Sequence, residues 1–195
     1  MIEFLQQPFY HVITPDDDRL LDASNRLDPH PNQDFSWGED CIVDKKRYYD
    51  CEMTPSYVFW MRKFMFDRNI SLHLHITDIW KCEYGRGNFQ EPHDHPNCDI
   101  VSVIFLDNPS PKGGDFYFEN YNGQTPHVVQ HKKGDMMVFS PKMIHGVTPL
   151  NLSIFDRIRK KRRRTVSINA DIISWEPWEG SVNEHLYNEQ LAGSS

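Results

Sequence analysis

The feature that most constrains the fold is a series of segments, from residue 70 onward, in which apolar and polar residues alternate. Side chains on a β-strand point alternately to its two faces, so a period of two is typical of strands with one buried face. Turn-forming Gly, Pro and Asn residues separate the segments. We therefore predict a β-sandwich or barrel over about residues 70–175. The alternating segments are ISLHLHITDIWKCEY (70–84), DIVSVIFLD (99–107), GDFYFEN (114–120), HVVQHK (127–132), GDMMVFS (134–140) and RTVSINADII (164–173).

Two segments before residue 70 have the pattern of helices. Each begins with Thr-Pro, at residues 14–15 and 54–55, and these residue types suit the first turn of a helix. We predict one helix over 15–26, where three aspartates follow the proline at the positive end of the helix dipole. We predict the other over 54–69, which carries a broad apolar face at helical spacing.

The length of the chain predicts its domain organisation. With 195 residues and 38% apolar content, it can form one real hydrophobic core. No linker-like break separates the helical and the alternating regions, so we predict a single domain over 1–195. In this prediction an N-terminal helical layer (1–69), which also includes a short strand within 1–14, packs on the β core (70–175), and residues 176–195 form a tail.

Charge, hydropathy and cysteine content narrow the class of protein. The net charge of −7 argues against a protein that binds nucleic acid through its bulk charge. No apolar run approaches the roughly 20 residues of a membrane span, and the first residues lack the basic and apolar parts of a signal peptide. The four cysteines include no CxxC pair. We therefore predict a cytoplasmic protein with reduced cysteines and no membrane association.

The stretch GNFQEPHDHPN (87–97) contains a candidate metal site. If it forms a strand, His93 and His95 point to one face and Asp94 to the other, so the two imidazoles can chelate one metal ion. The best third ligand is His145, about 50 residues later, which antiparallel strand pairing in a barrel can bring close. Three ligands on one face leave coordination positions open, as in non-heme iron oxygenases.

A second His-x-His pair shows how common this pattern is. His73 and His75 lie in the strand-like segment SLHLHITD, which no Gly or Pro precedes. No downstream histidine is an obvious partner for them. We interpret this pair as structural.

The residues around the first pair resemble a known family. Five landmarks occur in order over about residues 78–172: the run from Gly87 to His95, IFLDN (104–108), Gly113–Gly114, KKGDMMVF (132–139) with His145 after it, and an arginine near 163. In this order they resemble the 2-oxoglutarate/Fe(II) dioxygenases of the prolyl-4-hydroxylase-like class. The chain looks most like the phage and bacterial oxygenases of that class that have an HxH motif. The resemblance implies a double-stranded β-helix, or jelly roll, with helices packed on it.

The resemblance also implies the cofactors and their ligands. Fe(II) is expected on His93, His95 and His145, with 2-oxoglutarate and dioxygen as cosubstrates and a peptidyl side chain or a small molecule as substrate. The family usually has aspartate where this chain has His95, and Asp94 would replace His95 as ligand only if the strand is bulged. The implied reaction is hydroxylation.

An arginine on the last strand is expected to hold the distal carboxylate of 2-oxoglutarate. Arg163, Thr165 and Ser167 share one strand face with other polar residues, so we expect them to face the interior, with Arg163 as the anchor and the two hydroxyls assisting. A shift of one residue would make Arg164 the anchor instead.

Three alternatives remain open at this stage. Gly87, His93 and His95 also fit the opening motif of a cupin, with Asp99 near the position of its carboxylate ligand, and a cupin does not use 2-oxoglutarate. The fold could instead serve as a binding or structural module that holds zinc or no metal. The run RIRKKRRR (157–164), with seven of the 21 basic residues, could bind nucleic acid or an anionic substrate, although a solvated loop before the last strand is the favoured interpretation.

Overall fold

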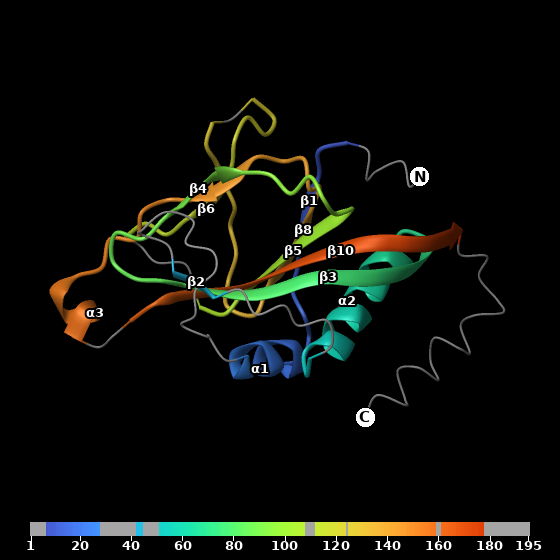
Figure 1. Cartoon of the computed structure of the whole chain (residues 1–195), viewed down its shortest axis with the longest axis horizontal. Helices are drawn as coiled ribbons and strands as arrows, with labels where there is room; N and C mark the ends of the chain where they lie inside the picture. Colours follow the sequence, from blue (N-terminus) through green and yellow to red (C-terminus); the bar gives the residue numbers. More distant parts are fainter. Residues whose placement is uncertain are drawn as a thin grey trace.

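The computed structural model describes residues 7–27, 42–44, 51–107, 112–123, 125–158 and 161–177. Their helices and strands follow one another as shown in Figure 1. The elements are β1 (Tyr10–Ile13), α1 (Arg19–Arg26), β2 (Ile42–Asp44), α2 (Thr54–Phe66), β3 (Ile70–Tyr84), β4 (Gln90–His93), β5 (Ile100–Phe105), β6 (Phe116–Phe118), β7 (His127–Val128), β8 (Met136–Phe139), β9 (His145–Val147), α3 (Ile154–Ile158) and β10 (Arg163–Pro177).

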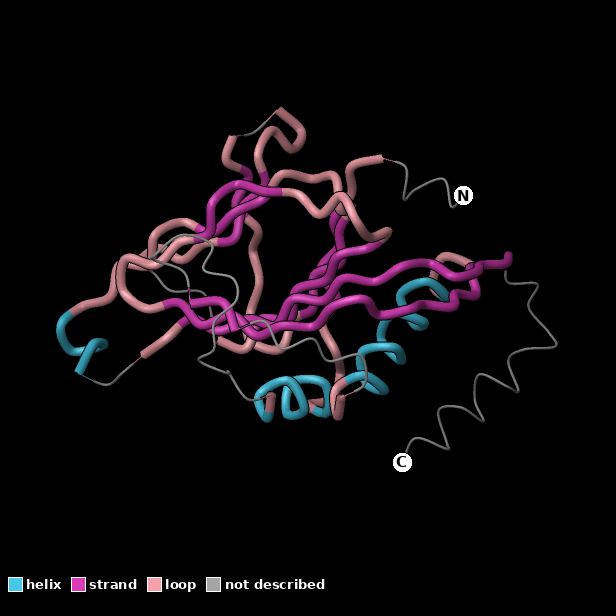
Figure 2. Tube along the Cα trace, viewed as in Figure 1, coloured by secondary structure: helices cyan, strands magenta, loops and turns pink. Residues whose placement is uncertain are grey.

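The strands form two antiparallel sheets that enclose a common interior (Figure 2). The larger sheet has the order β1-β8-β5-β10-β3-β2, and the smaller has the order β4-β9-β6-β7. Several neighbours, such as β1 and β8 or β4 and β9, are far apart in sequence, as in a jelly roll. The predicted fold class, a jelly roll with N-terminal helices packed on it, is therefore confirmed.

The interior between the sheets is filled by both aromatic and aliphatic side chains. Phe116 and Phe118 of the smaller sheet meet Phe139 of the larger sheet edge to face, with ring centroids 5.9 and 5.2 Å apart. Strand β5 is buried along its whole length, because one of its faces lines this interior and the helices cover the other. A strand with two buried faces explains why its sequence, IVSVIF, is almost wholly apolar.

The two N-terminal helices cover the outer face of the larger sheet (Figure 1). Helix α2 begins at Thr54 as predicted, with its proline in the first turn, and ends at Phe66, three residues early. Helix α1 begins at Arg19, so the predicted start at residue 15 was wrong. The reason is that the hydroxyl of Thr14 donates a hydrogen bond to Asp135 Oδ1 (2.8 Å) and does not cap the helix.

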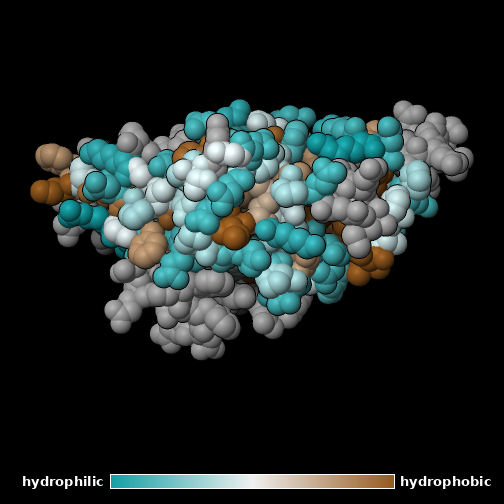
Figure 3. Space-filling model, turned by 90° about the horizontal axis from the view of Figure 1, so that it is seen from above, coloured by the Kyte–Doolittle hydropathy of each residue, from teal (hydrophilic) through white to brown (hydrophobic). Residues whose placement is uncertain are grey.

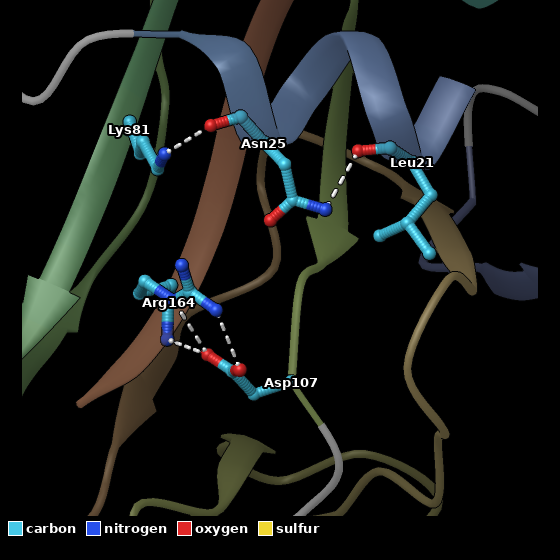
Figure 4. A network of polar contacts seen from close by, with 5 residues as sticks. All are labelled: Leu21, Asn25, Lys81, Asp107 and Arg164. Carbon is cyan, nitrogen blue, oxygen red and sulfur yellow. Dashed lines mark hydrogen bonds and ion pairs between the residues drawn. The ribbon is translucent and has the colours of Figure 1, made fainter. Parts of the chain in front are cut away.

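A buried lysine attaches α1 to the sheet (Figure 4). Lys81 of β3 is only 4% exposed, and its Nζ donates to the carbonyl oxygens of Asn25 and Leu27 at 3.0 and 2.9 Å. These carbonyls lie at the end of α1, where backbone acceptors lack partners within the helix and a cation is favourable. Lys81 points to the helix side of the sheet, away from the interior.

Strands β3 and β10 form a long ribbon that extends beyond the rest of the larger sheet (Figure 2). Their register is interrupted between Asn169 and Ala170 and between Ile172 and Ser174. In the outer part of the ribbon His73 and His75 are exposed. The predicted tail lies outside the described residues except for Glu176 and Pro177, which end β10.

The N-terminal region is not only helical, because β1 and β2 add to the edges of the larger sheet. The sequence pattern indicated a strand for β1 but not for β2, β4 or β9, although the metal-site prediction assumed a strand at His93. Strand β4 contains Pro92 and β9 contains Gly146, residue types that are depleted in strands.

The surface seen in Figure 3 is largely hydrophilic. Brown, apolar atoms appear at the end of the molecule where α3 lies, and Ile154 and Phe155 of α3 are 68% and 74% exposed. Within the part of the chain that the structure describes, no helix has both the length and the apolar character to cross a membrane.

Candidate metal centre

Three histidines meet between the ends of two short strands. His93 ends β4 and His145 begins β9, and these two residues are directly opposite each other in the antiparallel register. His95 follows β4, and its backbone N–H donates to the carbonyl of Pro141 at 2.9 Å. One ligand atom of each histidine lies within 4.8 Å of those of the other two, so the group could hold a metal ion.

His95 belongs to this group and Asp94 does not. The prediction assumed that both histidines lie in one strand, but β4 ends at His93. What brings His95 back beside His145 is its backbone bond to the segment before β9, and the two imidazole rings lie 5.1 Å apart and nearly parallel. Asp94 is exposed to solvent.

Backbone carbonyls orient two of the imidazoles. Nδ1 of His93 lies 2.8 Å from the carbonyl oxygen of Glu91, and Nδ1 of His145 lies 2.9 Å from that of Met143. A carbonyl oxygen only accepts, so Nδ1 is the protonated nitrogen in each ring and donates this bond. The Nε2 lone pair is then left for a metal, as is usual for histidine ligands.

Burial favours the neutral, metal-binding form of these histidines. It lowers the pKa of His93 and lowers that of His145 well below the ordinary value for histidine. The neighbouring imidazoles lower the pKa of His145 further. An imidazole must be unprotonated to bind a metal, so this environment prepares the group for one.

The histidines form one wall of a pocket between the two sheets. Arg163, Thr165 and Ser167 of β10 line the pocket from the larger sheet, as strand alternation predicted. Strand β3 also lines the pocket. Its Tyr84 is paired in register with Arg163, so the two side chains point to the same face of the sheet. The apolar part of the lining includes Trp80, Val101, Val103, Phe116 and Val147.

Arg163 is a buried cation whose terminal nitrogens have no partner. It is 7% exposed, and neither Nη1 nor Nη2 makes a hydrogen bond. Its guanidinium lies 5.1 Å from the centroid of the Tyr84 ring, and burial lowers the pKa of the arginine. An unpaired buried charge is costly, and a planar guanidinium matches a carboxylate in two hydrogen bonds. The arrangement therefore fits a carboxylate ligand.

Gly114 makes room for this arginine. A Cβ atom at residue 114 would lie 3.1 Å from Cδ of Arg163 and 2.9 Å from Cδ1 of Leu150. Its φ of +77° is also a conformation that favours glycine. The Gly-Gly turn noted in the sequence thus lies beside the stem of Arg163.

Solved structures resemble this arrangement of sheets, although no protein-family model and no curated protein matches the sequence. An oxidoreductase of the 2OG-Fe(II) oxygenase family from Burkholderia pseudomallei has 15% identity and a TM-score of 0.56, covering 83% of this chain and 84% of that one. A prolyl hydroxylase from Trichoplax adhaerens, in complex with a hypoxia inducible factor peptide fragment, has 13% identity and a TM-score of 0.59, covering 99% and 90%. HygX from Streptomyces hygroscopicus, with nickel, 2-oxoglutarate and hygromycin B bound, has 11% identity and a TM-score of 0.57, covering 87% and 85%.

This chain has the fold of the 2OG-Fe(II) oxygenases. The family resemblance predicted from the motifs is confirmed at the level of the fold. Identities of 11–15% establish the fold alone, so the roles of individual residues have to be argued from this chain's own site.

The neighbouring arginine of this oxygenase-fold protein is already paired. Nε and Nη2 of Arg164 donate to the two carboxylate oxygens of Asp107 at 3.1 and 2.9 Å (Figure 4). Arg164 is partly exposed on the helix side of the sheet. Its charge is therefore compensated outside the pocket, which distinguishes it from Arg163.

Asp99 and Lys161 of the basic run do not line the pocket of the histidine group. Asp99, the carboxylate of the cupin alternative, is exposed and accepts a hydrogen bond from the backbone N–H of Ile172 (2.9 Å). In the basic run, Lys161 pairs with Asp156 (2.8 Å), and Arg163 and Arg164 are placed as described above. The predicted loop at this run is also partly wrong, because α3 extends to Ile158.

Sequence reasoning missed part of the pocket wall. Phe116 stacks on the imidazole of His145, with ring centroids 5.3 Å apart, and Cys82 lies in register with Thr165 on the pocket side. Trp80, Cys82 and Tyr84 alternate along β3 and therefore share one face of the strand. Only the pairing of β3 with β10 decides that this face lines the pocket.

Proposed function

We propose that this protein is a non-heme Fe(II)/2-oxoglutarate-dependent dioxygenase that hydroxylates a peptidyl side chain or a small molecule. One observation carries the proposal. Three imidazoles and a buried arginine with unpartnered nitrogens line the same pocket, from opposite sheets. A metal-binding group alone suits many functions, but the added carboxylate-binding group favours a site for a metal together with an anionic cosubstrate.

In this proposal His93, His95 and His145 would hold Fe(II). Three protein ligands leave positions for other molecules at the metal. When bound, iron and 2-oxoglutarate would supply the oxidative chemistry, in which one atom of dioxygen enters succinate and the other the hydroxylated product. The protein's own task is to bind, orient and shield these reactants.

Arg163 would bind the distal carboxylate of 2-oxoglutarate through its two terminal nitrogens. Thr165 and Ser167 share its strand face, and their hydroxyls would add hydrogen bonds. Trp80 and Phe116 would keep water from the reaction, since both are almost fully buried and line the pocket beside histidine rings.

The substrate class stays broad in this proposal. The Trichoplax prolyl hydroxylase is in complex with a peptide fragment and the Streptomyces protein with hygromycin B, so this fold accommodates both kinds of molecule. We also propose a cytoplasmic location, because the described cysteines, Cys51, Cys82 and Cys98, are all unpaired thiols.

The test is an anaerobic titration with Fe(II) and 2-oxoglutarate, followed by an assay of succinate formation in air. We expect a weak visible absorption band at about 500 nm that needs both ligands. We also expect succinate formation that needs iron and is lost in His145→Ala. Iron binding without the band, or succinate formation that persists in His145→Ala, would contradict the proposed site.

A further inference from the structure

We infer that the divalent metal and the dicarboxylate bind to this protein in a mutually dependent way, because no carboxylate among the described residues belongs to the metal-binding group. The inference rests on the proposed function, since it concerns the same pocket. The inference adds to the proposed function the prediction that the affinity for the metal is low when no dicarboxylate is bound.

A bound divalent metal ion would give the site an excess of positive charge. The group that could hold the metal consists of three imidazoles, and no carboxylate of the described residues belongs to it. The ring N–H groups of His93 and His145 donate to backbone carbonyls, which are neutral. Asp94, the carboxylate nearest in sequence, is exposed to water.

The same pocket already contains an uncompensated cation. Arg163 is almost fully buried, and its terminal nitrogens have no hydrogen-bond partner. The carboxylates nearest to it are otherwise engaged: Asp107 pairs with Arg164, and Asp115 Oδ2 accepts a hydrogen bond from the Thr148 hydroxyl (3.3 Å). A divalent ion on the neutral histidines would therefore add two more positive charges to a low-dielectric pocket.

A dianionic chelate would reduce this positive charge at both ends of the pocket. One carboxylate would offset charge at the metal, and the other would pair with Arg163. By thermodynamic linkage, an anion that strengthens metal binding by some factor is itself bound more tightly by the same factor when the metal is present. A carboxylate ligand in place of His95 would supply one negative charge permanently and so weaken this dependence.

The experiment measures Co(II) affinity by calorimetry, with the free Co(II) concentration corrected for its binding to each acid in solution. The purified 195-residue protein is compared with its variants His95→Asp and His95→Asn. The two replacement side chains have nearly equal size, and only the aspartate is charged. Each is titrated alone, with 2-oxoglutarate, and with oxalate, a dianion that chelates the metal and is too short to reach Arg163. Circular dichroism and thermal unfolding check that the variants fold.

We expect 2-oxoglutarate to raise the Co(II) affinity of the natural sequence by at least about tenfold more than that of His95→Asp. His95→Asp should bind Co(II) alone more tightly than His95→Asn does. Equal enhancement in the natural protein and His95→Asp, or equal affinity of the two variants for Co(II) alone, would overturn the inference.

The two anions separate this inference from the proposed function. In one outcome, oxalate raises the Co(II) affinity of the natural protein more than that of His95→Asp, and 2-oxoglutarate does not raise it. This outcome would support the charge argument and contradict 2-oxoglutarate as the cosubstrate. Enhancement by 2-oxoglutarate to the same degree in all three proteins would support the cosubstrate and overturn the charge argument.

Discussion

The chain contains two His-x-His pairs, and they have opposite environments. His73 and His75 lie on the exposed outer part of the β3–β10 ribbon. His93 and His95 lie at the end of β4, facing His145 of the adjacent strand β9. The spacing of the two pairs is identical, so spacing does not explain the difference. What distinguishes the second pair is a third histidine that strand pairing brings to it.

The adjacent arginines Arg163 and Arg164 teach the same lesson. They differ by one position in β10 and therefore point to opposite faces of the sheet. Arg164 meets a carboxylate on the helix side, whereas Arg163 enters the pocket and finds none within hydrogen-bond distance. In both comparisons, residues of the same type differ because the neighbouring strand or loop brings a partner side chain to one of them and not to the other.

The comparison of the histidine pairs is tested most strongly by removing one ligand from each. We expect His93→Ala to weaken Co(II) binding by about 100-fold or more, because a chelate loses one of three ligands. The matched change His73→Ala should leave Co(II) affinity unchanged. Calorimetric titration measures both, and a similar loss in the two variants would remove the distinction between the pairs.

The variants Arg163→Gln and Arg164→Gln test the difference between the two arginines. Loss of charge-assisted hydrogen bonds should reduce the affinity for 2-oxoglutarate by roughly 10- to 100-fold in Arg163→Gln. Arg163→Gln should also stabilise the ligand-free protein by about 1 kcal/mol, since it removes an unpaired buried charge. Arg164→Gln should leave the affinity unchanged and cost about 1 kcal/mol or less.

These two variants are compared by 2-oxoglutarate titration and by urea unfolding without ligand. An equal loss of 2-oxoglutarate affinity in both would show that Arg163 is not the specific anchor.

The contact between β4 and β9 can be broken without touching a ligand. A Cβ atom at Gly146 would lie 2.7 Å from the hydroxyl of Tyr117 and 2.9 Å from the carbonyl oxygen of Gln90. We expect Gly146→Ala to push these strands apart, to destabilise the protein by about 1–3 kcal/mol and to weaken Co(II) binding by about tenfold. Urea unfolding and calorimetry measure the two effects. Undiminished metal affinity would mean that the register of β4 and β9 is not what positions the histidines.

The smallest expected effect concerns a histidine that is largely buried but outside the metal-binding group. His131 stacks on Phe105, with ring centroids 3.7 Å apart, and burial lowers its pKa. Below about pH 6.5 the unfolded chain protonates this ring more readily than the folded chain does, so His131 makes stability fall as the pH falls. Water screens the partly exposed ring, so we expect an effect under about 1 kcal/mol.

Replacing this ring by phenylalanine tests the sign. Urea unfolding at pH 7.5 and 5.5, with EDTA present, should show a smaller loss of stability in His131→Phe than in the natural protein. An equal or larger loss in the variant would show that His131 does not contribute to the pH dependence.

Much of the site was predictable from local pattern. Alternation placed Arg163, Thr165 and Ser167 on one face of the last strand, and they do line the pocket. His145 was identified as the partner of the pair by its distance along the chain and its position after a strand. Alternation did not reveal β4 and β9, and the position of His95 depends on a backbone bond to Pro141 that no local pattern shows.

The sequence by itself determined the period-two strands, the helical start at residue 54 and the residue types that could bind a metal and a carboxylate. These follow from side-chain alternation, turn residues and donor chemistry, which act over a few neighbouring residues. Only the tertiary structure decided which histidine pair meets a third histidine and which arginine lacks a counterion. Both depend on residues about 50 or more positions apart, such as His93 and His145 or Arg164 and Asp107, and on which face of each strand is turned inward.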